Sequence, residues 1–300
     1  MWPLLAVGTA LLYALHGAWS TRISRRIGAL PAAWALYGFS FPVLALYLAI
    51  RGLPVVDPGF WPTWSAAAAG HLLASYLFFS ALRTGELSLT FPLLALTPIF
   101  VPAVEWVLLD ELPGVGGLTG IALTVAGVYL LNLGSIEAGI FAPLLALARD
   151  GPAVRTLAVA VIWSVTGTMD RVAVLDSSPA FYGAMLTLAL TLLSLPFAVA
   201  GTRPRAEAGG PRRLRAFRSR LRRAGRGGLL IHGALFAFML ILQMEALTLT
   251  LASYILSIKR TGTVVAVLLG SLVFREGGLR DRLVGTIVTL AGTLVLVLFG

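Results

Sequence analysis

The chain has 300 residues, of which 58% are hydrophobic and only 12% are charged, whereas soluble domains are about one quarter charged. This composition excludes an ordinary soluble domain and favours a protein that lies within a lipid bilayer. The sequence holds no cysteine, which excludes disulfide bonds, thiol catalysis and cysteine-bound metal. The net charge of +10 lies mostly between the apolar runs, so it indicates orientation in a membrane and not a nucleic-acid partner.

Ten apolar runs follow one another along the chain, and each is close to the ~17–25 residues that cross a bilayer. They predict an all-α integral membrane protein with ten transmembrane helices. The predicted spans cover residues 2–20, 31–50, 62–82, 87–109, 116–133, 153–175, 179–200, 228–248, 250–274 and 281–299. The first run has neither a basic segment before it nor a small-residue cleavage site after it, so we interpret it as a retained span and not as a signal peptide.

Lysine and arginine are unequally divided between the two sets of connections. Nineteen lie in the connections that follow odd-numbered spans, ten of them in a Gly/Arg-rich loop at 201–228. Only Arg51 and Arg171 lie in the other connections. Because positive residues stay in the cytoplasm, this bias predicts a cytoplasmic Arg-rich loop and two external termini. Binding of anionic lipid or nucleic acid by the loop is the alternative interpretation.

An internal repeat organises the chain. The segment that starts at Ala81, ALRTGELSLTFPLLALTPIF, aligns without a gap with the segment that starts at Ala246, 165 residues later, and GIALTVAG then aligns with GTIVTLAG. More loosely, YALHGAW from Tyr13 resembles WSVTGTM from Trp163. Each half holds five spans, an odd number, so the second half enters the membrane inverted, with a site expected between the halves. The predicted units are a first five-helix repeat at 1–134, a connecting segment at 135–152 and a second five-helix repeat at 153–300.

The ten spans, the two inverted repeats and the acidic residues that close spans four and nine, in LLDELP and LVFREG, resemble the EamA type of the drug/metabolite transporter superfamily. The resemblance covers nearly the whole chain. It implies a secondary active transporter that moves a small organic solute, either a metabolite or a drug, and it does not specify the substrate.

Two adjacent cations, Lys259 and Arg260, lie inside the ninth span, in SIKRTGTVVAVLLGSLVF. A charge at this depth costs at least ~2.5–3.5 kcal/mol on insertion scales. The segment is similar to the corresponding helix of the triose-phosphate/phosphate translocators, and this resemblance implies that the two cations bind an anionic group of the substrate. Those proteins use a further lysine in the fourth span, where this chain has Leu94. The alternative is an ion pair with Glu245 on the neighbouring eighth span, which would leave one positive charge over.

Other polar and aromatic side chains on the spans are candidates for the same site. They occur on one face of span eight, on span three, and on matching faces of spans one and six, where Asp170 also lies. Each has an alternative role in helix packing, and the histidines have a further one in proton exchange. The predicted substrate-binding residues are Lys259, Arg260, Gln243, Glu245, His71, His232, Tyr13, His16 and Trp163.

Three further features indicate structure. Pro92, Pro98 and Pro102 interrupt span four. The carbonyl oxygens that they free are candidates for binding polar groups, and a kink that moves during transport is the alternative interpretation. Glu105, one turn from the end of that span, is interpreted as a charge at the membrane interface, and a coupling carboxylate is the alternative. Glycines spaced seven residues apart in spans five and ten predict close helix packing. These are Gly120, Gly127, Gly285 and Gly292.

The leading hypothesis is a secondary active transporter of a small organic solute that carries an anionic group, working by alternating access. The alternative is a membrane-embedded lipid flippase or lipid-handling protein. An enzyme is not expected, because the chain has no G-x-S-x-G serine, no pair of intramembrane aspartates and no H-E-x-x-H. We expect no cofactor and no metal, the solute and the lipid bilayer as partners, coupling to a proton or a counter-substrate, and a monomer or weak homodimer in the cell (inner) membrane.

Overall fold

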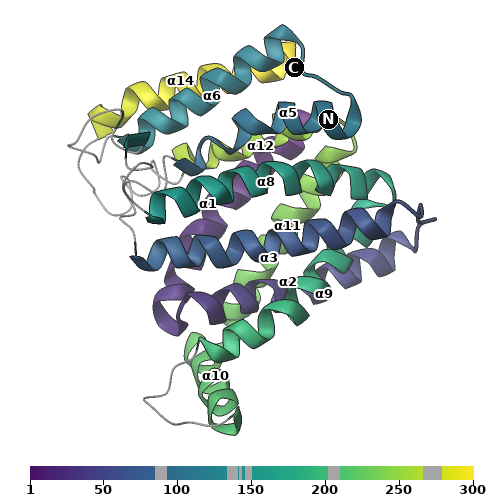
Figure 1. The fold of residues 1–300 in the computed structure, drawn as a ribbon, viewed down its shortest axis with the longest axis vertical. Coiled ribbons are helices and arrows are strands. Elements are labelled where there is room, and N and C mark those ends of the chain that lie inside the picture. The colour runs from purple at the N-terminus through teal and green to yellow at the C-terminus, as the bar shows by residue number, and fades with distance from the viewer. Residues whose placement is uncertain (85–92, 134–140, 142–143, 146–150, 202–209, 266–278) are drawn as a thin grey trace.

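The computed structural model describes the chain except for residues 85–92, 134–140, 142–143, 146–150, 202–209 and 266–278. Its described residues form eleven helices and no strand, which confirms the all-α prediction (Figure 1). In chain order the helices are α1 (Trp2–Ile27), α2 (Ala29–Arg51), α3 (Phe60–Thr84), α5 (Thr97–Leu109), α6 (Val115–Leu133), α8 (Gly151–Leu175), α9 (Pro179–Ala200), α10 (Gly210–Ala224), α11 (Arg226–Leu247), α12 (Ala252–Arg260) and α14 (Leu279–Phe299).

Most of these helices have the apolar character of membrane spans. Among the described helices, five are long and apolar enough to cross a bilayer by length and composition: α1, α2, α8, α9 and α11. Three shorter stretches are also apolar, at 97–109, 115–131 and 283–299. A described helix occupies at least part of every predicted span, although residues 85–92 of span four and 266–278 of span nine lie outside the described residues. The first helix extends beyond its predicted end at residue 20 to Ile27.

The helices pack in pairs that follow the internal repeat. Span two packs on its repeat mate, span seven, as α2 against α9, and span five packs on span ten as α6 against α14. In the repeat, α1 corresponds to α8 and α3 corresponds to α11. The pair formed by α1 and α11 therefore corresponds to the pair formed by α8 and α3. Figure 1 shows α6 and α14 together at one end of the stack and α2 with α9 toward the other. Such pairing is what two inverted halves related by a two-fold axis in the membrane plane produce.

Glycines bring α6 and α14 into close contact. A Cβ atom on Gly127 would lie 2.3 Å from the backbone nitrogen of Thr289, and one on Gly292 would lie 2.4 Å from that of Thr124. Both threonines are fully buried. Because backbone atoms of a packed helix cannot move aside as a flexible side chain can, these positions admit only glycine without a shift of one helix. The predicted close packing of spans five and ten is confirmed.

Gly292→Ala is therefore expected to lower the free energy of unfolding by about 1–3 kcal/mol, the usual cost of overpacking an interior. Gly17→Ala is the matched control, because Gly17 also lies within a helix but a Cβ there meets nothing within 4 Å. Alanine favours the helix over glycine, so the control should keep or gain stability. Thermal unfolding of the purified protein in detergent measures both, and equal melting temperatures for the two variants would contradict the close contact.

Spans four and nine are interrupted at repeat-equivalent positions. In span four the helix is interrupted at Ala95 and Leu96, directly before α5 begins. In span nine α12 ends at Arg260 and the chain turns at Thr261. Leu96 and Thr261 are 165 residues apart, which is the offset of the repeat. Both residues keep right-handed helical dihedral angles, and the chain there forms i→i+3 hydrogen bonds, so each interruption is a short 3₁₀-type turn, a feature that often marks a hinge.

Threonine hydroxyls donate hydrogen bonds to carbonyl groups at both interruptions. Proline at position 98 has no N–H to bond the carbonyl oxygen of Leu94, four residues earlier. That oxygen instead accepts a hydrogen bond from Oγ1 of Thr97 at 2.8 Å. At the second interruption, Oγ1 of Thr261 donates to the carbonyl oxygen of Ile258 at 2.7 Å. The interrupted backbone is thus tolerated at membrane depth because its polar groups remain paired inside the protein.

The Arg-rich loop differs from its prediction as an irregular connection, because it contains α10. Phe217, Leu221 and Ala224 recur at helical spacing and form an apolar stripe between the arginines. The stripe packs against the ends of α1, α2 and α11, and the ring of Phe217 meets that of Trp34 with centroids 5.1 Å apart. The helix forms because this apolar stripe is buried. The high arginine content of the segment makes the stripe difficult to recognise in the sequence.

Candidate functional site

Lys259 lies at the end of α12, beside the interruption of span nine. Its Nζ donates a hydrogen bond to Oε1 of Gln243 on α11 at 2.7 Å. The ammonium also lies over the ring of Tyr13 on α1, 5.5 Å from the centroid. The residue keeps part of its surface exposed. An amide oxygen and an aromatic face therefore replace part of the water that this cation lost.

Arg260 has a different set of partners. Its Nη2 donates to Oγ1 of Thr97 at 3.0 Å, and its Nη1 donates to the hydroxyl of Tyr13 at 3.4 Å. The guanidinium lies over the ring of Trp163 on α8, 5.8 Å from the centroid. In the part of the chain that the structure describes, its partners are all neutral. Since a guanidinium carries five N–H donors, this leaves donor capacity for an anion.

Glu245 does not pair with either cation. Its carboxylate accepts a hydrogen bond from the hydroxyl of Tyr47, and its Oε1 lies 3.8 Å from Nη2 of Arg51. Both partners are on α2, and the Arg51 side chain is mostly exposed. The alternative of an ion pair between Glu245 and the two cations is therefore wrong. Two steps along a helix rotate a side chain by about 200°, so Gln243 and Glu245 point to opposite sides of α11.

Asp170, on the same helix as Trp163, is the carboxylate that interacts electrostatically with Lys259. It is 3% exposed, and its Oδ1 lies 2.9 Å from Nε2 of His71 on α3. The hydroxyl of Tyr182 on α9 also donates to Oδ1. Sequence reasoning placed Asp170 on the correct face of span six but left it out of the candidate set. An aspartate inside a membrane span is itself the signal that could have identified it.

The other two candidate histidines form a separate pair. The rings of His16 on α1 and His232 on α11 are stacked with centroids 5.4 Å apart, and Phe236 lies against His16. Nε2 of His232, which is fully buried, is 3.2 Å from the carbonyl oxygen of Ala32. The structure thus brings His16 and His232 together one turn from Tyr13, and places His71 against Asp170.

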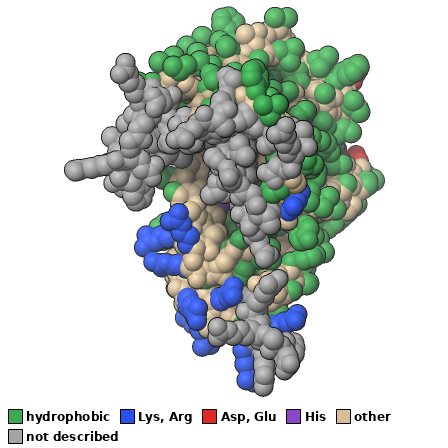
Figure 2. All heavy atoms as spheres, turned by 60° about the vertical axis from the view of Figure 1, so that its left-hand side comes forward, with side chains coloured by type: hydrophobic (Ala, Val, Ile, Leu, Met, Phe, Trp, Pro, Cys, Tyr) green, Lys and Arg blue, Asp and Glu red, His purple; other side chains and the backbone are tan. Residues whose placement is uncertain are grey.

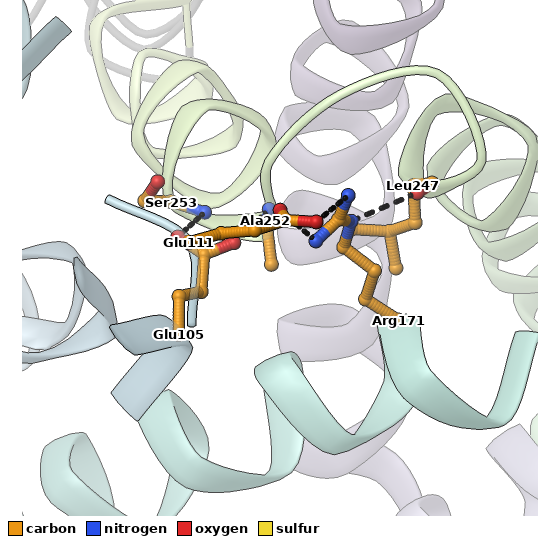
Figure 3. Close-up of polar contacts among 6 residues, drawn as sticks. All are labelled: Glu105, Glu111, Arg171, Leu247, Ala252 and Ser253. Atoms are coloured by element: carbon orange, nitrogen blue, oxygen red, sulfur yellow. Dashed lines mark hydrogen bonds and ion pairs between the residues drawn. The ribbon is translucent and has the colours of Figure 1, made fainter. Parts of the chain in front are cut away.

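At the end of the bundle near both termini, buried charges hold the turn between α11 and α12 (Figure 3). Glu105 on α5 is fully buried, so its interpretation as an interfacial charge is wrong. Its carboxylate accepts hydrogen bonds from the backbone nitrogens of Ala252 at 2.6 Å and Ser253 at 3.3 Å. These are the first two N–H groups of α12, which have no partner within the helix. The positive end of the helix dipole also favours a carboxylate there.

Arg171 on α8 completes this clamp from the opposite side. Its Nε donates to the carbonyl oxygen of Leu247, the last residue of α11, at 3.3 Å. Its two terminal nitrogens donate to Glu111 at 2.6 and 3.4 Å. Arg171 therefore belongs to the interior of α8 and not to the connection in which the charge count placed it. A cation at the end of one helix and an anion at the start of the next match both helix dipoles.

The clamp gives a stability test. Glu105→Ala should lower the free energy of unfolding by about 1–3 kcal/mol, because it leaves two buried N–H groups without an acceptor. Glu111→Ala removes a carboxylate of the same clamp that is 42% exposed, so its effect should be smaller. Thermal unfolding in detergent compares the two, and a larger loss for Glu111→Ala would show that the helix start does not depend on Glu105.

Among the described residues no group of three or more His, Cys, Asp or Glu side chains is placed to hold a metal ion. The polar contacts instead connect six helices around the interrupted spans. These are α1, α3, α5, α8, α11 and α12, with α9 contributing Tyr182 behind Asp170. What this arrangement offers a ligand is a guanidinium, an ammonium, aromatic faces and hydroxyl groups.

Comparison with known proteins agrees with the repeat. The model of the EamA-like transporter family matches residues 1–133 and matches again at residues 153–298. No curated protein matches the chain at a significant level. A solved structure described only as "Crystal structure of protein" has the same fold, with a TM-score of 0.73 and 17% sequence identity, over 100% of this chain and 99% of its own. The two family matches together cover most of the sequence, and the chain belongs to the EamA-like transporter family.

Proposed function

We propose that the protein is a secondary active transporter that binds a small organic solute through an anionic group at Lys259 and Arg260. Membership of a family of membrane transporters supports the general activity. The observation that carries the anion is the environment of Arg260, whose partners among the described residues are two hydroxyl groups and an indole ring. The predicted binding residues other than Glu245, which faces α2, remain part of this proposal, with Thr97 added from the geometry.

The charge balance around the cations also supports an anionic ligand. Lys259 and Arg260 contribute two positive charges, and Asp170 contributes one negative charge that interacts with Lys259. A fold of this kind does not need charge at this depth, since the repeat-equivalent residues are Leu94 and Ala95. One unbalanced cation at membrane depth is costly unless it faces a polar ligand. A monoanionic group of the solute would neutralise it.

The proposed transport cycle uses the interrupted spans as the moving parts. Helices α5 and α12, which belong to the interrupted spans four and nine, contact each other at the site. A change in helix angle at either interruption therefore moves one side of the site. Opening toward the termini requires the start of α12 to leave Glu105 and the end of α11 to leave Arg171. Alternating access then consists of releasing this clamp while the opposite end closes, as expected for two inverted halves.

For the sidedness we propose that the arginine-rich end is cytoplasmic and that both termini are external. Exposed arginines gather on α10 and at the end of α1, and Figure 2 shows positive side chains grouped over this part of the surface. Fluorescent protein fused after residue 300 should be dark and alkaline phosphatase fused there should be active. The opposite result for both fusions would invert the assignment.

Arg260→Gln is expected to weaken binding of the anionic solute by about 1.5–3 kcal/mol, the range for a hydrogen bond to a charged group, which is roughly ten- to hundredfold in Kd. Lys259→Gln should also weaken it, although less, because Lys259 already has Gln243 and Asp170. Arg51→Gln is the matched control, since it removes an exposed arginine outside the site. A thermal-shift screen of organic anions, amino acids and cations identifies the solute, and proteoliposome uptake measures its transport.

Two outcomes would contradict the proposal. If Arg260→Gln and Lys259→Gln bind and transport the solute as the wild type does, the cations are structural. If the reconstituted protein moves labelled phospholipid between leaflets and shows no saturable solute uptake, the lipid-flippase alternative replaces the transporter.

A further inference from the structure

Exposed arginines gather where the end of α1 meets α10, and six of them define what we call the arginine surface. The six are Arg22, Arg25 and Arg26 on α1 and Arg215, Arg218 and Arg222 on α10. The two helices are in contact, and Figure 2 shows positive side chains grouped over this part of the molecule. Among the described residues, no carboxylate forms an ion pair with any of the six. Like charges brought together in this way repel one another, so the surface favours a partner with negative charge.

Helix α10 is held in a way that leaves its arginines free for a partner. Its apolar stripe packs against the ends of α1, α2 and α11. Arg215, Arg218 and Arg222 recur at helical spacing on a different face of α10, and all three are exposed. Arg220 has a structural role, because its Nη1 donates to the carbonyl oxygen of Ile27, the last residue of α1, at 3.4 Å. The charge of the other three is therefore not needed to hold the helix in place.

The exposed face of α1 shows the depth at which the arginine surface lies. Exposed side chains recur every three or four residues along this face, and the first of them are apolar: Leu4, Val7, Leu11 and Leu15. On a membrane span, such a face is turned toward the lipid tails. Arg22 and Arg25 continue the same face, and the guanidinium of Arg22 lies over the ring of Trp19, 5.3 Å from the centroid. Since tryptophan is typical of the headgroup level, the change from leucine to arginine marks that level.

We propose that the arginine surface binds the phosphate groups of anionic phospholipids. Its charge selects an anion, and guanidinium groups match phosphate with paired hydrogen bonds. Its depth selects a lipid, because a nucleic acid could approach α10 from water but could not cover the lipid-facing side of α1. The sidedness proposed above places the surface in the cytoplasmic leaflet, where anionic lipids are concentrated. Lys259 and Arg260 take no part in this binding, so the proposed function is tested separately.

A bound lipid would restrain both repeats at this end of the molecule. Helix α10 contacts α1 and α2 of the first repeat and α9 and α11 of the second. Figure 1 shows it beyond α2 and α9, at the end of the stack away from α6 and α14. A phosphate held between α1 and α10 neutralises their mutual repulsion and keeps α10 against the spans. Anionic lipid should therefore raise the melting temperature of the protein more than a zwitterionic lipid does.

Native mass spectrometry of the full chain in detergent measures the dissociation constants of individual lipids. Dioleoylphosphatidylglycerol should bind more tightly than dioleoylphosphatidylcholine by roughly tenfold or more, since each arginine near anionic lipid contributes about 1 kcal/mol, or roughly fivefold. Arg22→Gln and Arg218→Gln should each weaken binding of the anionic lipid by roughly fivefold and leave the zwitterionic lipid unchanged. Arg51→Gln is the matched control, because it removes a mostly exposed arginine outside this surface. Equal affinity for the two lipids, or an equal loss in Arg51→Gln, overturns the proposal.

The wild type alone provides a second measurement. Because the six arginines are exposed, added sodium chloride should weaken binding of the anionic lipid and have little effect on the zwitterionic one. Anionic-lipid binding that does not change with salt overturns the charge-based site without any variant.

Competition separates lipid from the other anions that the surface could hold. Neither inorganic phosphate nor a short single-stranded DNA should displace dioleoylphosphatidylglycerol at equal concentration. Complete displacement by inorganic phosphate would make a soluble phosphate the ligand. DNA that binds more tightly than the lipid, and that loses affinity in Arg218→Gln but not in Arg22→Gln, would make α10 a nucleic-acid site. Either result overturns the assignment to lipid.

Discussion

Holding two adjacent cations inside a helix bundle determines what the surrounding side chains have to be. A charge taken out of water must regain hydrogen bonds or meet an opposite charge. Around Lys259 the replacements are the Gln243 amide and the Tyr13 ring, and around Arg260 they are hydroxyl groups and an indole. These groups come from α1, α5, α8 and α11, so the cations connect most of the bundle to the end of α12. The same contacts that make the charges tolerable also fix the position of the interrupted span.

The clamp at the opposite end of α12 acts on the same segment. Glu105 holds its first turn and Arg171 holds the last turn of α11, while Gln243 and Lys259 bond to each other further in. The hairpin of α11 and α12 is thus held by hydrogen bonds at its turn and by a hydrogen bond between its two helices. Arg171 directly follows Asp170 on α8, so any shift of this helix changes the clamp and the carboxylate together. The clamp at Arg171 and the buried carboxylate of Asp170 are therefore mechanically connected through α8.

Much of this architecture can be predicted from the sequence, because it depends on patterns within single segments. Apolar length predicts the spans, the repeat predicts two inverted halves, and a glycine spacing shared by two spans predicts where helices touch. The partners of the polar side chains are harder to predict from the sequence, because they depend on which side of a helix faces the site. Glu245 lies only two residues from Gln243, yet it faces α2, and Asp170 takes the role of the nearby carboxylate.

Charged residues near the ends of segments were misjudged for a related reason. Glu105 lies close enough to the end of its span to reach the interface, and only the position of α12 shows that it is buried against two N–H groups. In the same way, the apolar stripe of α10 has meaning only where the ends of α1 and α2 offer it a surface. In each case the residues that lie nearby in the fold determine the environment of the side chain, and composition does not.

The two halves share a scaffold but not its charges, and this asymmetry has a physical consequence. At the repeat-equivalent positions, Glu105 corresponds to Gly270 and Asp170 corresponds to Ser20, just as the cations correspond to Leu94 and Ala95. A symmetric scaffold alone would give the two halves equivalent polar contacts. The carboxylate that caps α12 is therefore not supplied by the repeated scaffold, because the residue at the equivalent sequence position is glycine. The polar environment of α12 therefore depends on residues that the internal symmetry does not repeat, and its cap at Glu105 and its neighbour Arg171 distinguish the two halves physically.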